Sequence, residues 1–317
     1  WLLRTPGWVV RTVSARPLAN RRVAAAPISW GVCEVPGWGL QLPPERVLPE
    51  IAALGFEATE LGPIGWLPLE PVALRARLDR HRLQLVGGFV PLVLHERDLA
   101  PARADAERIA RVLAAAGAEL FEAAVVMDAG WAPPAPLDDA AWGLLTDHLA
   151  QIHELVAGIG LELVLHPHAG TLVEREEEIE RVLAATQVPL CLDTGHLSIA
   201  GVDPVVFTRR HGERVAHVHL KDIDFGLAER FRSGELTLVE ATQKGLFRPL
   251  GHGDAAIAEV VELLERKGYE RWLVLEQDTA ITGEEPLVGR GPVLDVQASV
   301  AYLNELAPMT QEEVPQT

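Results

Sequence analysis

Four groups of titratable side chains each follow directly after a short apolar run in the second half of the chain. The groups are His166-Pro167-His168, Asp193-Thr194-Gly195-His196, His217-Val218-His219 and Glu276-Gln277-Asp278. If the apolar runs are parallel strands, their carboxyl ends meet at one edge, where the active site of a closed barrel lies. Imidazole nitrogen mixed with carboxylate oxygen suits Mn²⁺, Co²⁺, Fe²⁺ or Zn²⁺ better than Ca²⁺, which prefers oxygen alone. The pattern therefore predicts one divalent metal ion.

Each of the four groups, taken alone, is weak support for a metal site. A single histidine at a strand end is more often a hydrogen-bonded core or rim residue than a ligand. Asp193 alone could cap the next turn, and Glu276 alone could pair with an arginine. His217 and His219 are two residues apart on a strand, so their side chains point to the same side. Because all four groups share one position relative to their strands, we expect one Asp, one Glu and at least two His among them to converge on a metal ion.

The apolar runs that must position these side chains alternate with longer amphipathic runs, most of which end near Gly or Pro. Eight strand–helix units in this length predict an α/β fold with a single (β/α)8 TIM barrel, its active site at the C-terminal ends of the strands. An open doubly wound sheet is the alternative, but the first strand is not followed by G-x-G-x-x-G. The expected strands are 28–32, 56–61, 83–90, 120–127, 161–165, 189–192, 215–220 and 272–275.

The chain is expected to divide into an extension at 1–25, the barrel at 26–308 and a tail at 309–317. Residues 1–22 contain five arginines and no acidic residue. This composition is typical either of a disordered extension or misplaced start, or of a targeting peptide.

Charge and cysteine content restrict the classes of partner. With 28 basic and 45 acidic residues, the net charge of −17 repels phosphate backbones and anionic lipids, which argues against nucleic-acid and membrane partners. No apolar run is long enough for a transmembrane helix. Cys33 and Cys191 lie in apolar segments and form no disulfide framework, which indicates a reducing cytoplasm.

Other candidate residues have two interpretations each. Glu60, which ends the second expected strand, could bind a substrate hydroxyl or pair with a buried Lys or Arg. Trp30, Trp38 and Trp66 could form an apolar wall of the pocket or pack at its rim. The long polar stretch 224–253 could cover the pocket as a lid or form a subunit contact. In the second case the protein would be a homo-oligomer.

Five motifs in order resemble the xylose-isomerase-like family of sugar isomerases and epimerases, and within it the inosose dehydratases. The resemblance extends over about residues 28–306. The motifs are HPHAGT from His166, LDTGH from Leu192 with Ala200-Gly201, HVHLKD from His217, Pro249-Leu250-Gly251 with Gly253, and LVLEQD from Leu273.

This resemblance implies roles for individual residues. Asp193, His219 and Glu276 would be metal ligands, with a fourth from the fifth strand, and the ion would be Mn²⁺ or Co²⁺, with Zn²⁺, Fe²⁺ or Mg²⁺ as alternatives. The groups expected to carry the chemistry are Glu276, Lys221 and His196. The residues expected to contact the substrate are His168, His196, His217, Lys221, Glu60 and Trp30.

One departure from the family pattern bears on the reaction. Isomerases and epimerases of this family carry a glutamate at the end of the fifth strand, where this chain has His166. Epimerisation needs a base on each face of the substrate, whereas dehydration needs one base, one acid and a Lewis acid. The departure favours a metal-dependent dehydratase (a lyase) acting on a ketocyclitol or keto-sugar such as an inosose. An isomerase or epimerase that uses His166 as its second base is the alternative.

Two further classes are weighed against this interpretation. A DNA-repair phosphodiesterase would need several metal ions and a basic groove, and the charge of −17 and the lack of a further set of Glu and His ligands argue against it. A non-catalytic barrel would have no need of all four strand-end groups.

Overall fold

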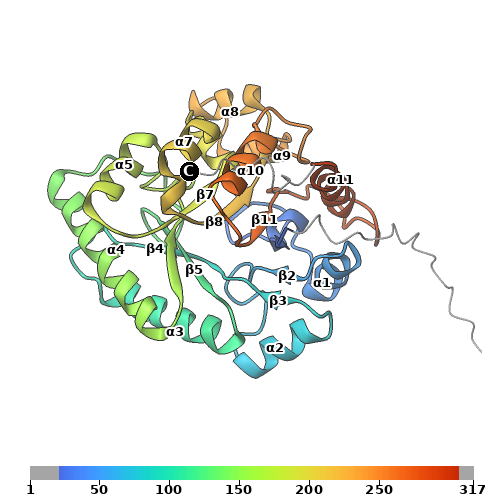
Figure 1. The fold of residues 1–317 in the computed structure, drawn as a ribbon, viewed down its shortest axis with the longest axis horizontal. Coiled ribbons are helices and arrows are strands. Elements are labelled where there is room, and N and C mark those ends of the chain that lie inside the picture. Colours follow the sequence, from blue (N-terminus) through green and yellow to red (C-terminus); the bar gives the residue numbers. More distant parts are fainter. Residues whose placement is uncertain (1–20, 307–317) are drawn as a thin grey trace, which may run out of the picture.

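Parallel strands form a closed barrel in the computed structural model, which describes residues 21–306 (Figure 1). The expected tail, and most of the expected extension, lie outside the described residues. The order in the main sheet is β3-β2-β1-β11-β8-β7-β6-β5-β4. Its strands are β1 Val23–Ala25, β2 Ala58–Thr59, β3 Gln84–Leu85, β4 Phe89–Leu92, β5 Leu120–Val125, β6 Glu162–Leu165, β7 Leu190–Asp193, β8 Val215–Leu220 and β11 Leu273–Leu275.

The barrel closes through its third strand position. β3 pairs with β2 and β4 pairs with β5, and only Val86-Gly87-Gly88 separates β3 from β4. Within this link, the N–H of Val86 donates to Thr59 on one side, and its carbonyl accepts from Leu120 on the other. The nine strand segments therefore fill eight positions, and the predicted TIM barrel is confirmed.

Helices surround the sheet and bury their apolar faces against it. The N–H groups that end α3 and α4 belong to Gly117 and Gly160, whose φ angles of 89° and 102° suit glycine. No helix of residues 21–306 is both long and apolar enough to cross a membrane. The surrounding helices are α1 Pro44–Ala53, α2 Pro71–Asp79, α3 Ala100–Ala116, α4 Asp139–Ile159, α5 Glu176–Ala185, α7 Pro204–His211, α10 Ile257–Arg266 and α11 Pro292–Glu305.

The predicted position of the first strand is wrong. β1 lies at Val23–Ala25, where it pairs with β2 and β11, and Pro27–Trp30 forms a short 3-10 helix instead. Proline has no N–H for a ladder bond and fixes φ, so the strand cannot continue through Pro27. The barrel thus begins inside the range 1–25 that the sequence assigned to an extension. The expected third strand at 83–90 is also interrupted, at Gly87-Gly88.

The long polar stretch 224–253 is folded and covers one side of the barrel mouth. It contains α8 Phe225–Arg232, α9 Leu238–Gln243 and β10 Phe247–Arg248, and β10 pairs antiparallel with β9 Asp222–Ile223. These elements share a small apolar core with α6 Thr194–Ile199. Their position agrees with the interpretation of the stretch as a cover over the pocket.

Candidate active site

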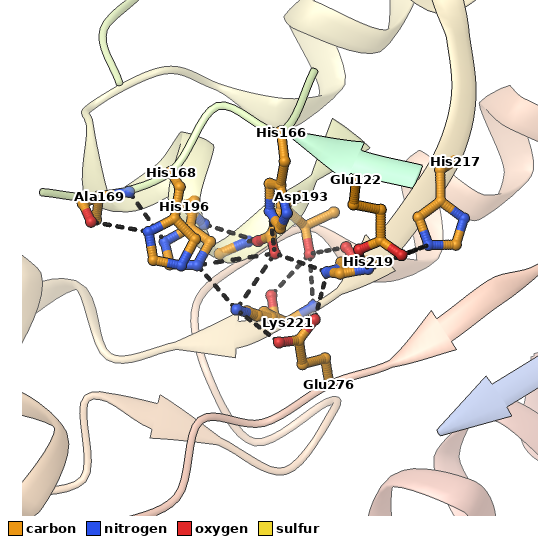
Figure 2. Close-up of polar contacts among 12 residues, drawn as sticks. Glu122, His166, His168, Ala169, Asp193, His196, His217, His219, Lys221 and Glu276 are labelled. Atoms are coloured by element: carbon orange, nitrogen blue, oxygen red, sulfur yellow. Dashed lines mark hydrogen bonds and ion pairs between the residues drawn. The ribbon is translucent and has the colours of Figure 1, made fainter. Parts of the chain in front are cut away.

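The predicted ligand groups converge at the mouth of the barrel (Figure 2). Oδ2 of Asp193, at the end of β7, lies 3.4 Å from Nε2 of His166, which follows β6. The same oxygen lies 3.6 Å from Nδ1 of His219 on β8, and that nitrogen contacts Oε2 of Glu276, which follows β11. All four side chains are buried. Residues up to 110 positions apart in sequence therefore face one point.

The carboxylate of Asp193 is held by the helix that follows it. Its Oδ1 accepts hydrogen bonds from the N–H groups of Gly195 and His196, at 2.9 and 2.8 Å, and so caps α6. Oδ2 is left to face the mouth. A side chain at Gly195 would place its Cβ 2.5 Å from Cβ of Lys221, so only glycine lets α6 begin this close to β8. Asp193 is thus both a helix cap and a candidate ligand.

Four atoms that meet at the mouth are buried without a hydrogen-bond partner among the described residues. They are Nε2 of His166, Oδ2 of Asp193, Nδ1 of His219 and Oε2 of Glu276. An unsatisfied buried polar group costs about 1–3 kcal/mol, so four in one place call for a missing partner. Two ligands of a tetrahedral ion with bonds of about 2.0–2.1 Å lie about 3.4 Å apart. Their chemistry fits a divalent metal ion, since ligand atoms of Asp193, His219 and Glu276 lie within 4.8 Å of one another and His166 lies next to Asp193.

The structure separates the two histidines that follow the fifth strand position. His166 points its Nε2 at Asp193, whereas Nδ1 of His168 lies 2.9 Å from the carbonyl oxygen of Ala169. The ring of His168 also packs on His196, with ring centroids 3.6 Å apart. Of the two, His166 is therefore the one that faces Asp193.

Lys221 is fully buried beside these groups, in contact with three carboxylates. Its Nζ lies 2.8 Å from Asp278, 3.2 Å from Glu276 and 3.4 Å from Asp193. Burial works to lower the pKa of Lys221, but the three carboxylates outweigh it and hold the pKa well above its ordinary value. Nζ is also 2.8 Å from Nε2 of His196, whose own pKa is held well below its ordinary value by burial and nearby positive charge. Lys221 is thus the cation and His196 the neutral partner.

A cavity of about 760 Å³ opens above this cluster, a volume in the range of small-molecule sites. Its polar floor includes Glu60, His166, His168, His219, Glu276 and Asp278. An apolar wall is formed by Trp38, Phe89 and Trp131, and α8 and α9 supply further lining. Asp193, His196 and Lys221 do not line the cavity and lie directly behind its floor.

The family described as Xylose isomerase-like TIM barrel matches residues 48–306. The chain belongs to this family. It is 32% identical to the rhizopine catabolism protein MocC of Rhizobium meliloti, over 85% of each protein. It is 33% identical to an inosose dehydratase of Geobacillus kaustophilus, over 82% of this chain and 89% of that protein. The resemblance to the xylose-isomerase-like family, stated from the motifs, is confirmed.

Solved structures of the xylose isomerase-like fold superpose on this barrel. One described as the IOLI protein with a binding zinc atom has a TM-score of 0.66 and 11% sequence identity, and it covers 90% of this chain and 98% of its own. At this identity the likeness concerns the fold.

Two residues that were expected to contact a substrate do not line the cavity. Trp30 is fully buried, and its indole N–H donates to Glu50 on α1 at 2.9 Å, because the 3-10 helix turns this side chain outward. His217 is fully buried below His219, one step earlier on the same face of β8. Both assignments are therefore withdrawn. Lys221 and His196, also expected to contact substrate, lie behind the lining.

Glu60 lines the cavity, and its side-chain partners are two histidines. Its Oε1 lies 3.0 Å from Nε2 of His217 and 2.8 Å from Nε2 of His219, rather than near a lysine or arginine. These contacts favour the charged carboxylate strongly enough to lower its pKa well below the ordinary value, although burial acts in the opposite direction.

Sequence reasoning missed two carboxylates. Asp278, inside the last motif, lines the cavity, and burial raises its pKa to about 7 despite the ion pair with Lys221. Glu122 lies fully buried inside the barrel on β5. The available signal was that Glu122 is the single charged residue in an expected apolar strand. Buried charges of this kind are normally paired or bound to a metal.

Proposed function

We propose that the protein is a divalent-metal-dependent dehydratase that acts on a ketocyclitol or keto-sugar of the inosose class. The observation that carries this proposal is the set of four buried ligand atoms that have no hydrogen-bond partner among the described residues, next to a cavity with carboxylates on its floor. The similarity to proteins named inosose dehydratase supports the choice of substrate. Mn²⁺ and Co²⁺ are the expected ions.

His166, Asp193, His219 and Glu276 would hold the metal ion. When bound, such an ion acts as a Lewis acid that polarises the substrate ketone and so acidifies the neighbouring C–H group. Oδ1 of Asp193 stays on the helix cap, which orients the carboxylate. Because His166 is assigned as a direct ligand, its loss would weaken metal binding more than it would change the fold.

Glu276 and Asp278 are the carboxylates to which we assign proton transfer. Both line the cavity, and Lys221 contacts both. We assign the removal of the α-proton to Glu276, whose Oε1 faces Lys221, and protonation of the departing β-hydroxyl to Asp278. The C–H and C–O bonds break, a C=C bond forms, and one water leaves. Lys221 positions the two carboxylates, and His196 positions Lys221.

The proposal is tested by the mass of the product. Protein stripped of metal and reloaded with Mn²⁺ or Co²⁺ is incubated with a panel of inososes and ketoses, and products are analysed by mass spectrometry. We expect one water to be lost from at least one inosose, and no product without metal. Products of unchanged mass from every substrate would refute the dehydratase and favour an isomerase or epimerase, which exchanges a C–H proton in D₂O and keeps all its oxygen atoms.

A further inference from the structure

A second cluster of ligand side chains lies inside the barrel, below the mouth. It consists of Glu60 after β2, Glu122 on β5 and His217 on β8, with Nε2 of His219 next to them. Figure 2 shows Glu122, His217 and His219 of this cluster. One ligand atom from each of these four residues lies within 4.8 Å of the others. The lack of a further set of Glu and His ligands, expected from the sequence, is therefore wrong.

The spacing inside this inner cluster matches a metal coordination sphere. Nε2 of His217 lies 3.0 Å from Oε1 of Glu60 and 3.6 Å from Oε1 of Glu122. Atoms that share a tetrahedral ion lie about 3.4 Å apart. Both glutamates and the histidine are buried, so water does not compete freely for these atoms.

Glu122 provides an independent sign that a ligand is missing. The residue is 0% exposed, and neither of its carboxylate oxygens has a hydrogen-bond partner in the described part of the chain. The histidine nitrogens that face them are Nε2 of His219 at 3.3 Å and Nε2 of His217 at 3.6 Å. The barrel leaves room for this carboxylate, because a Cβ on Gly87 would lie 2.9 Å from its Oε1. A buried carboxylate with no hydrogen bond is costly unless a cation compensates it.

We propose that the inner cluster is a second divalent-cation site, held by Glu60, Glu122 and His217. Two carboxylates balance the charge of the ion, and one imidazole with two carboxylates is a ligand set that Zn²⁺ accepts. Glu60 lines the cavity and so gives the ion a route of entry. This site goes beyond the proposed function and does not depend on the identity of the substrate.

The inner site is linked to the mouth through His219. Its Nδ1 faces Asp193, while its Nε2 lies 2.8 Å from Oε1 of Glu60. Histidines that bind a metal usually donate their other N–H to a carboxylate, which fixes the tautomer and the ring orientation. An ion that holds Glu60 in place would therefore also hold Nδ1 of His219 free for the ion at the mouth.

The test is the number and position of bound ions. Full-length protein is stripped with a chelator and reloaded with Zn²⁺ alone, and ions per chain are measured by mass spectrometry and located by anomalous X-ray diffraction. We expect two ions per chain, one at the mouth and one between Glu60, Glu122 and His217. Glu122→Gln should bind only the mouth ion. Glu50→Gln, which also replaces a buried glutamate, is the matched control and should still bind two.

Each result bears on one site separately. A single ion at the mouth of the wild-type protein would overturn the inner site and leave the proposed function standing. Two ions retained by Glu122→Gln would also overturn it. An ion in the inner cluster with none at the mouth would support this inference and contradict the proposed metal centre. If Glu122→Gln does not fold by circular dichroism, the wild-type diffraction data decide.

Discussion

Oδ2 of Asp193, the last residue of β7, lies 3.4 Å from Nε2 of His166, which follows β6. The second histidine of the same motif, His168, faces the cavity and packs against His196 instead. A two-residue difference in sequence thus separates a candidate metal ligand from a candidate substrate contact.

The first prediction compares these two histidines. His166→Gln should weaken binding of the mouth ion by at least about 100-fold, because it removes a direct ligand. His168→Gln should bind that ion like the wild type and raise KM, because its ring lines the cavity. Metal titration and steady-state kinetics measure the two effects. Equal loss of metal in both variants would contradict the assignment.

The second prediction concerns stability after metal removal. A ligand present at 100 times its Kd stabilises the folded state by about 2.7 kcal/mol, so EDTA should lower the unfolding temperature of the wild-type protein. Asp193→Asn should shift less with EDTA. Asparagine can still cap α6 through its side-chain oxygen, so the variant should remain folded. Differential scanning calorimetry with and without EDTA makes the comparison, and an undiminished shift in the variant would count against the mouth site.

The third prediction concerns Asp278. Its replacement by Asn keeps the size of the side chain but removes a group that can give up a proton. We expect kcat to fall by about 10²–10⁴-fold with the metal content unchanged, as for loss of a general acid. Kinetics and metal analysis of the same sample provide the measurement. Asp295→Asn, the same substitution at an exposed aspartate on α11, is a control that should retain activity. Wild-type kcat in Asp278→Asn would exclude the proposed role.

The fourth prediction concerns the pH dependence of stability at the cover of the pocket. Asp224 caps α8 by accepting from Leu227, and it pairs with Arg248 at 2.9 Å. The hydrogen bond from Leu227 and the contact with Arg248 lower the pKa of Asp224 below its ordinary value. A lowered pKa means that the charged form stabilises the fold above the ordinary value near pH 3.8, and that this contribution disappears as the pH falls through the folded pKa.

Asp224→Asn should therefore be less stable than the wild type at pH 7, by about 0.5 kcal/mol because the pair is partly exposed. The difference should shrink toward zero below pH 4. Urea unfolding at several pH values measures it. A difference that is constant from pH 7 to pH 3.5 would show that charge does not contribute.

The strand-end motifs made much of this protein predictable from its sequence. The barrel class and the meeting of Asp193, His219 and Glu276 follow from local patterns, because parallel strands place their carboxyl ends on one edge. A residue just past an apolar run can therefore be assigned to the mouth of the barrel before any of its contacts is known. The same logic identified His166 and His168 but left them equivalent.

Only the tertiary structure decided which way individual side chains face. Trp30 turns outward because Pro27 ends β1, and His217 lies one layer below the cavity because it precedes His219 by two residues on the same face of β8. Glu122 sits in mid-strand, where an alternating pattern cannot say what it meets across the barrel. Distances across a closed sheet depend on the register of every strand between two residues, and that register is set by packing of the whole barrel.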